Sequence, residues 1–161
     1  MLKHQFVIYG LTALFGSLLL LGCNSSDTTS SSSSDDEETQ LEINVARLLD
    51  TKECERCNLR DAELANAILD FSELSNANLS NANLQRADLH QADFHDADLS
   101  NADLSNSKMK EANLGKADLT GADLSDAIVT GAYFFGADLM DAIWTDGSTC
   151  GSKSCNGKAY D

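Results

Sequence analysis

Four cysteines have the type and spacing that redox or metal chemistry requires. Cys54 and Cys57 have C-x-x-C spacing, which occurs in redox-active thiol pairs and in metal sites. Cys150 and Cys155 lie near the carboxyl end of the 161-residue chain. A redox role for C-x-x-C is typical of a thioredoxin-like βαβ unit. The sequence between the two pairs therefore decides which chemistry is open to them.

Two histidines are the second candidate for chemistry. His90 and His95 lie five residues apart, and two imidazoles can share a metal ion. The sequence surrounds them with no cage of carboxylates and contains no glycine-rich phosphate loop. We therefore predict no bound metal and no cofactor.

A five-residue phrase, repeated eighteen times without insertion from residue 57 to residue 146, must position these side chains. The third residue of each phrase, here called the centre, is large and apolar. The residue two before it is Ala in fifteen phrases, and Cys57, Ser72 or Ser107 in the others. Apolar residues five apart form no face on a helix and alternate between the faces of a strand. Each phrase must therefore end in a bend, so that one small and one large side chain point inward.

The phrase resembles the Ala-Asp/Asn-Leu-x-x motif of the pentapeptide-repeat family, over 90 of 161 residues. The resemblance implies an all-β fold, a right-handed quadrilateral β-helix of about four and a half coils, with four phrases per 20-residue coil. Its filled interior leaves no room for an active site, so no enzyme is predicted. Residues twenty apart become vertical neighbours. The centres then stack in four columns: Leu59, Leu79, Leu99, Leu119 and Leu139; Leu64, Leu84, Leu104, Leu124 and Trp144; Leu69, Leu89, Met109 and Val129; Leu74, Phe94, Leu114 and Phe134.

The amino end is predicted to be a lipoprotein signal peptide, residues 1–22. Lys3 gives a positive start, residues 6–21 are apolar, and the sequence Leu-Leu-Gly-Cys at 20–23 resembles a bacterial lipobox. The resemblance implies cleavage before Cys23 and attachment of lipid, palmitate included, to this cysteine. Asn24 favours the periplasmic side of the outer membrane over the inner membrane by the lipoprotein sorting rule. An uncleaved signal anchor is the alternative.

Two short segments connect the signal to the repeats. Residues 23–38, rich in Ser, Asp and Glu, are predicted to be a disordered tether. Residues 39–56 are predicted to form a capping helix and a turn, because Leu41, Val45, Leu48 and Leu49 recur at helical spacing. We expect this helix to lie over the first coil, and a partner-binding helix is the alternative.

The implied rod limits the disulfide pairings. Its ends lie about 20 Å apart, whereas bridged Cα atoms need about 4.4–6.8 Å, so pairing between the ends is excluded. We expect Cys150–Cys155 to close a loop in the carboxyl-terminal tail, residues 147–161. Cys54 and Cys57 remain open between a disulfide and buried thiols, with redox chemistry the least favoured alternative.

The acidity of the chain is concentrated in ladders. After removal of the signal, 26 acidic and 10 basic side chains remain, a net charge of −16. Asp98, Asp118 and Asp138 fall on one side of the implied coil, and Asp103 and Asp123 on the next. Carboxylates about 4.8 Å apart repel by about 1 kcal/mol in water. We therefore expect low salt to destabilise the fold, divalent cations to bind weakly, and no binding of nucleic acid.

Five apolar residues break the surface pattern near the carboxyl end. Ile128, Tyr133, Phe135, Met140 and Ile143 occupy positions that earlier coils give mostly to polar residues. Either the tail covers them, or they form a partner or homodimer contact through the C-terminal coils.

The function predicted from the sequence is a non-enzymatic, membrane-tethered scaffold in the bacterial cell envelope, whose protein partner the sequence does not name. Some family members, the quinolone-resistance proteins, resemble DNA in shape and charge and bind gyrase, so DNA mimicry is an alternative. A lipoprotein beyond the inner membrane would not reach gyrase. A redox or metal-binding envelope module is less favoured still.

Overall fold

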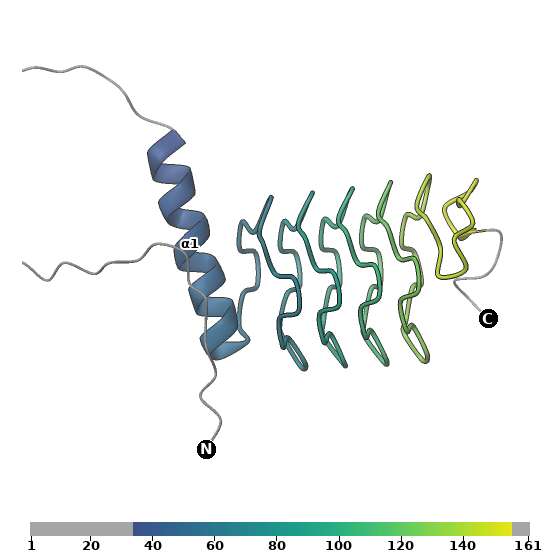
Figure 1. The fold of residues 1–161 in the computed structure, drawn as a ribbon, viewed down its shortest axis with the longest axis horizontal. Coiled ribbons are helices and arrows are strands. Elements are labelled where there is room, and N and C mark those ends of the chain that lie inside the picture. The colour runs from purple at the N-terminus through teal and green to yellow at the C-terminus, as the bar shows by residue number, and fades with distance from the viewer. Residues whose placement is uncertain (1–33, 156–161) are drawn as a thin grey trace, which may run out of the picture. The chain divides into compact units, whose positions relative to one another are not determined.

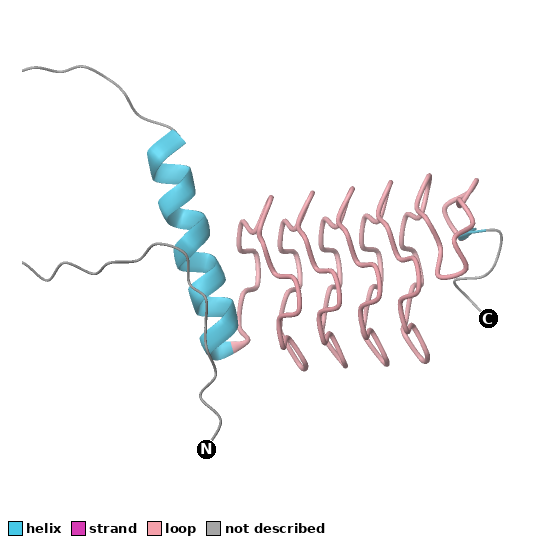
Figure 2. Cartoon of the chain, in the orientation of Figure 1, coloured by secondary structure: helices cyan, strands magenta, loops and turns pink. Residues whose placement is uncertain are grey.

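The computed structural model describes residues 34–155 (Figure 1). One helix, α1 (Ser34–Thr51), precedes a stack of coils. The coils are joined by isolated parallel bridges between residues 20 apart, from Glu53↔Glu73 to Asp123↔Ile143. Each bridge is too short to count as a strand, so the described solenoid is drawn as loops and turns (Figure 2).

In a phrase with Asp or Asn before the centre, the five backbone N–H groups are used in five ways, as the phrase 97–101 illustrates. Ala97 N–H donates to the carbonyl of the preceding centre at 2.9 Å, and Asp98 N–H donates to the coil before at 2.9 Å. Leu99 and Asn101 donate to the coil after at 2.7 and 2.9 Å. Ser100 N–H donates to Asp98 Oδ1 at 3.0 Å. Every amide of the phrase is thus satisfied, as buried backbone requires.

The last residue of each phrase makes the bend. It has a positive φ in nearly every phrase, for example 57° at Asn101 and 69° at Gly121. Asn, Asp and Gly tolerate this left-handed region best, which explains their frequency there. Phe71 and Arg86 adopt the same φ of 58°, because the surrounding coils impose it.

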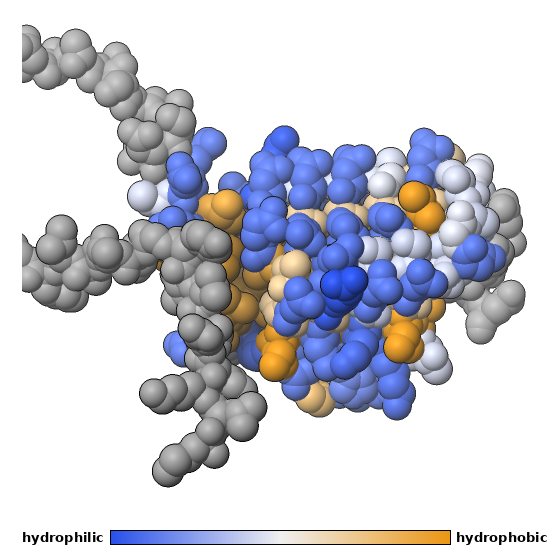
Figure 3. Space-filling view, in the orientation of Figure 1, coloured by the Kyte–Doolittle hydropathy of each residue, from blue (hydrophilic) through white to orange (hydrophobic). Residues whose placement is uncertain are grey.

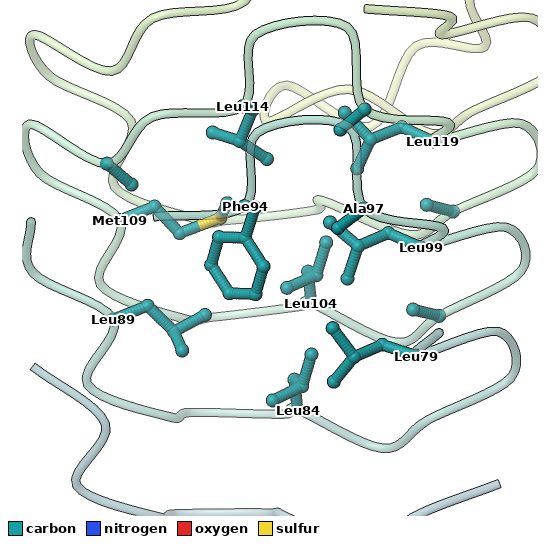
Figure 4. Packing of buried hydrophobic residues seen from close by; sticks show 14 of the residues in the cluster. Leu79, Leu84, Leu89, Phe94, Ala97, Leu99, Leu104, Met109, Leu114 and Leu119 are labelled. Atoms are coloured by element: carbon teal, nitrogen blue, oxygen red, sulfur yellow. The ribbon is translucent and has the colours of Figure 1, made fainter. Parts of the chain in front are cut away.

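The centres and the small residues fill the interior (Figure 4). Four faces result, which we number by their centres: face 1 carries the column of Leu99, face 2 that of Leu104, face 3 that of Met109 and face 4 that of Phe94. Leu79, Leu99 and Leu119 lie one above the other in Figure 4, as the 20-residue step predicts. The interior therefore has the close packing of a protein core, not the space of a binding channel.

The ladder begins one phrase earlier than the sequence pattern indicates. Residues 52–56 form a further phrase: Glu53 bridges to Glu73, Cys54 is a fully buried centre on face 4, and Arg56 makes the corner with a φ of 57°. The sequence pattern does not reveal this phrase, because Lys52 occupies the small-residue position and Cys54 occupies the position of the centre.

Helix α1 caps the amino-terminal coil. Leu48 is fully buried, Leu41 and Val45 pack against the core, and Asn44 Nδ2 donates to the Asn58 carbonyl at 2.8 Å. The expectation that Leu49 joins this apolar side is wrong: its side chain is 46% exposed, since it lies about 100° round the helix from Leu48. The predicted helix started at residue 39, whereas α1 starts at Ser34. The prediction of a disordered tether is therefore wrong for residues 34–38, which are helical. No helix within residues 34–155 is long and apolar enough to cross a membrane.

The carboxyl-terminal tail caps the other end over two faces. It reverses after residue 146, so that Trp144 N–H donates to Ser148 at 2.8 Å and Asp141 N–H to Cys150 at 2.9 Å. Leu139 N–H donates to Lys153 at 3.0 Å. The tail thereby accepts the hydrogen bonds of the last coil on faces 1 and 2. Within residues 34–155, no backbone bond is made by the four corresponding amides of faces 3 and 4, those of Val129, Gly131, Phe134 and Gly136.

Each end of the solenoid carries a disulfide. Cys54–Cys57 has a Cα–Cα distance of 5.2 Å, and Cys150–Cys155 a distance of 4.4 Å. The first bridge ties the opening phrase to the next one, and the second closes the reversed tail. Neither sulfur pair offers a free thiol for redox or metal chemistry in this state.

Two serines in the small-residue column give a test of core packing. Ser72 and Ser107 are buried, and their hydroxyls have no hydrogen-bond partner among the described residues. Because Ala fills the same position in most phrases, Ser107→Ala should raise the free energy of unfolding by about 1 kcal/mol. Equilibrium chemical denaturation measures the change. Ser105→Ala is the control: its hydroxyl accepts from Gln85 Nε2 at 3.2 Å, so this variant should gain nothing. Equal effects of the two variants would contradict the assignment.

Candidate interaction surfaces

The outer side chains, those just before and just after each centre, are the parts of the solenoid available for binding. Figure 3 shows a largely hydrophilic surface over the coils, with separated apolar side chains near both ends. Within residues 34–155, no group of three His, Cys, Asp or Glu side chains is placed to hold a metal. His90 Nδ1 bonds to the Lys110 carbonyl at 2.9 Å and His95 Nδ1 to Asp96 Oδ2 at 2.8 Å, so each has its own partner on its own face.

The acidic ladders have a structural role that the sequence analysis missed. Asp98, Asp103, Asp118, Asp123 and Asp138 each accept, through Oδ1, the N–H two residues later, at 2.8–3.1 Å. This Asx-turn bond needs a short side-chain acceptor, and Asn serves as well as Asp. The alternation of Asp and Asn at this position was the available signal. The turn therefore requires a side-chain acceptor oxygen and does not require a negative charge.

Asp138, at the top of the face 1 ladder, is clamped by the tail. Lys153 Nζ lies 2.5 Å from Asp138 Oδ2. This hydrogen bond is the main reason that the pKa of the Asp138 carboxyl is lowered, and it raises the pKa of Lys153. The clamp joins the reversed tail to the outer surface as well as to the coil edge.

The five predicted apolar residues lie at one end of the solenoid but on different sides. Ile128 lies on face 3, Tyr133 and Phe135 on face 4, Met140 on face 1 and Ile143 on face 2. Tyr133 and Phe135 stack with ring centroids 6.2 Å apart and remain exposed. The described part of the tail runs over faces 1 and 2, so it leaves Ile128, Tyr133 and Phe135 uncovered.

Face 3 gathers surface residues that sequence reasoning did not group. Ile68 and Ile128 are 67% and 52% exposed at its two ends, with Asp88 and Lys108 between them in the same column. A shallow groove of about 350 Å³ lies among Asp70, Asp88, His90, Lys108, Lys110 and Ile128. Asp88 Oδ2 and Lys108 Nζ lie 3.6 Å apart. The available signal was the step of 20 residues that separates Ile68, Asp88, Lys108 and Ile128. It groups them on one surface only after the coils are stacked.

The family model for pentapeptide repeats matches the chain in eight copies, at residues 57–96, 72–110, 97–134 and 109–141. These overlapping matches cover more than half of the chain. The chain belongs to the pentapeptide-repeat family. Proteins of this family adopt a right-handed quadrilateral β-helix and are generally non-enzymatic structural or interaction scaffolds. No curated protein matches this pentapeptide-repeat chain.

Solved pentapeptide-repeat proteins are similar to it. HetL of the cyanobacterium Nostoc, involved in heterocyst differentiation regulation, is 34% identical with a TM-score of 0.52, over 60% of this chain and 51% of HetL. A protein of the cyanobacterium Cyanothece is 32% identical with a TM-score of 0.58, over 63% of this chain and 83% of that one. A protein of the Arabidopsis thaliana thylakoid lumen is 33% identical with a TM-score of 0.54, over 56% and 63%. The chain thus spans about half the length of HetL.

The face 1 ladder predicts a salt-dependent stability. Asp118→Asn removes one charge between Asp98 and Asp138 but keeps the acceptor for the Thr120 N–H. We expect it to stabilise the fold by about 0.5–1 kcal/mol at low salt and by much less at high salt, where the repulsion is screened. Denaturation at two ionic strengths measures this. Asp118→Ala, which also loses the acceptor, should not gain. A salt-independent effect of Asp118→Asn would exclude ladder repulsion.

The tail clamp predicts a dependence on pH. The lowered pKa of Asp138 means that its ion pair contributes stability above the unfolded carboxyl pKa of about 3.9 and that this contribution is lost as the pH falls through the folded pKa. Lys153→Met should therefore destabilise the fold at neutral pH, and the difference from wild type should vanish in acid. Thermal unfolding from pH 2 to pH 7 measures it. Lys116→Met, at a lysine without an ion pair within residues 34–155, is the control. A difference that persists at pH 2 would contradict the clamp.

Proposed function

We propose that this protein is a lipid-anchored scaffold of the bacterial envelope: a solenoid held at Cys23 on the periplasmic side of the outer membrane, with its outer faces available to protein partners. Residues 1–33, which include Cys23 and the first part of the predicted tether, lie outside the described residues, so the anchor rests on the sequence. The family membership supports a binding role without catalysis, because the repeat specifies a scaffold more than an activity.

The filled interior is the observation that carries the scaffold role. Sixteen of the eighteen predicted centres are at most 3% exposed, Trp144 is 6% exposed and Val129 is partly buried. No space for a substrate remains inside the coils, so binding falls to the outer faces. The two disulfides are consistent with an oxidising compartment such as the periplasm, where such bridges persist.

Metabolic labelling with palmitate and fractionation of the cell envelope test the anchor. The full chain should incorporate label and sediment with the outer membrane. Cys23→Ala should abolish the labelling, and Asn24→Asp should retain the label but move the protein to the inner membrane. Protease added after opening the outer membrane should then reach the solenoid. An unlabelled, uncleaved wild-type chain would contradict lipidation.

A photo-crosslinking residue placed in turn on each face tests the scaffold role. Positions 120, 85, 110 and 95, whose side chains are exposed or half-buried, present faces 1 to 4. We expect an adduct with an envelope protein in intact cells, and from some faces more than others. The absence of adducts from all four faces would contradict a scaffold function, whatever the result of the labelling.

A further inference from the structure

Face 3 is the one face of the solenoid whose outer columns balance in charge. Its positions beside the centres carry Asp70 and Asp88 against Lys108 and Lys110. The corresponding positions of faces 1, 2 and 4 have more carboxylates than lysines and arginines. Two copies of this acidic chain therefore meet the least electrostatic repulsion when they approach through face 3.

The column before the centres of face 3 is complementary to its own reverse. From the amino-terminal coil upward it reads Ile68, Asp88, Lys108, Ile128, and the bridges Ile68↔Asp88, Asp88↔Lys108 and Lys108↔Ile128 fix this order. A two-fold axis that crosses the rods between the levels of Asp88 and Lys108 places each Ile opposite the other Ile of the second copy. The same axis places each Asp88 opposite a Lys108. The contact would extend over three coil steps, about 14 Å.

The two neighbouring columns obey the same axis. At the corners, Phe71, which is 58% exposed, falls opposite Gly131 of the second copy, where no side chain obstructs it. Gln91 falls opposite Glu111, and these two residues already bond at 2.6 Å within one chain. After the centres, His90 falls opposite Lys110, and its Nε2 is available because Nδ1 holds the Lys110 carbonyl of its own chain.

We propose that face 3 is a homodimer interface in which two copies pack side by side with their solenoids antiparallel. A parallel arrangement would instead place Lys108 opposite Lys110 and Ile68 opposite Asp70, pairing like charges and burying a carboxylate against an apolar side chain. The dimer is isologous, the commonest symmetry of soluble oligomers. It is independent of the lipid anchor and uses a different surface from the C-terminal contact predicted from the sequence, sharing only Ile128.

Charge exchange across the axis is the test. Lys108→Asp installs a residue that other phrases carry at this position, so the coil should fold. It places carboxylates opposite each other twice, and should raise the dimer Kd roughly tenfold or more. Adding Asp88→Lys to this variant exchanges the two charges and should restore wild-type association. Sedimentation velocity on the chain from Asn24, which keeps all the described residues, gives the Kd values. Lys116→Asp, the same change at a corner of face 4, is the control and should associate like wild type.

Mixed disulfide crosslinking tests the direction, both in this chain and in the full chain in cell membranes. Ile68→Cys mixed with Ile128→Cys should give a crosslinked dimer, and neither variant alone should. A wild-type chain that stays monomeric at all concentrations would overturn the proposal, as would crosslinking of Ile68→Cys with itself. Association that Phe135→Ser abolishes and Lys108→Asp leaves unchanged would overturn it too, in favour of contact through the carboxyl-terminal end.

Discussion

The structure depends on the hydrogen bonds that join each coil to the coil twenty residues away. Inside the stack, four of the five amides in a phrase donate to backbone carbonyls, and where Asp or Asn precedes the centre the fifth donates to that side chain. The left-handed corner keeps all five in register, because it turns the chain through a bend without breaking the ladder. Two positions of the phrase are therefore constrained strongly, the small residue and the large apolar centre, while a short acceptor precedes the centre in most phrases but not in all.

Much of this arrangement follows from the sequence because period, side-chain size and polarity change together. A five-residue repeat that alternates Ala and Leu can bury both only if the chain bends after each phrase, and this is enough to place the core and the columns. The phrase 52–56 could not be predicted, because Lys52 is not a small residue and Cys54 is not a large apolar centre. The backbone hydrogen bonds of this phrase form nevertheless. The prediction that Leu49 packs against the first coil was wrong. Four apolar residues recur at helical spacing in this segment, but only Leu41, Val45 and Leu48 reach the coil.

The surfaces were harder to predict than the core. The carboxylate ladders were visible as charge, but their turn bonds depend on where each amide points, which composition does not reveal. The apolar residues near the carboxyl end looked like one cluster along the chain, whereas the coil distributes them over four faces. Ile68 and Ile128 lie sixty residues apart in the sequence. They belong to one surface only because the coil places every twentieth residue in the same column.

The fixed spacing of the columns has a consequence for how such a chain can change in evolution. An insertion of one residue shifts every later centre out of the interior, whereas an insertion of five keeps the core but transfers every later side chain to the neighbouring face. Only a gain or loss of twenty residues preserves both the core and the identity of each face. Gene duplication in units of sixty nucleotides can therefore lengthen the rod by about 4.8 Å at a time and leave its surface chemistry in place.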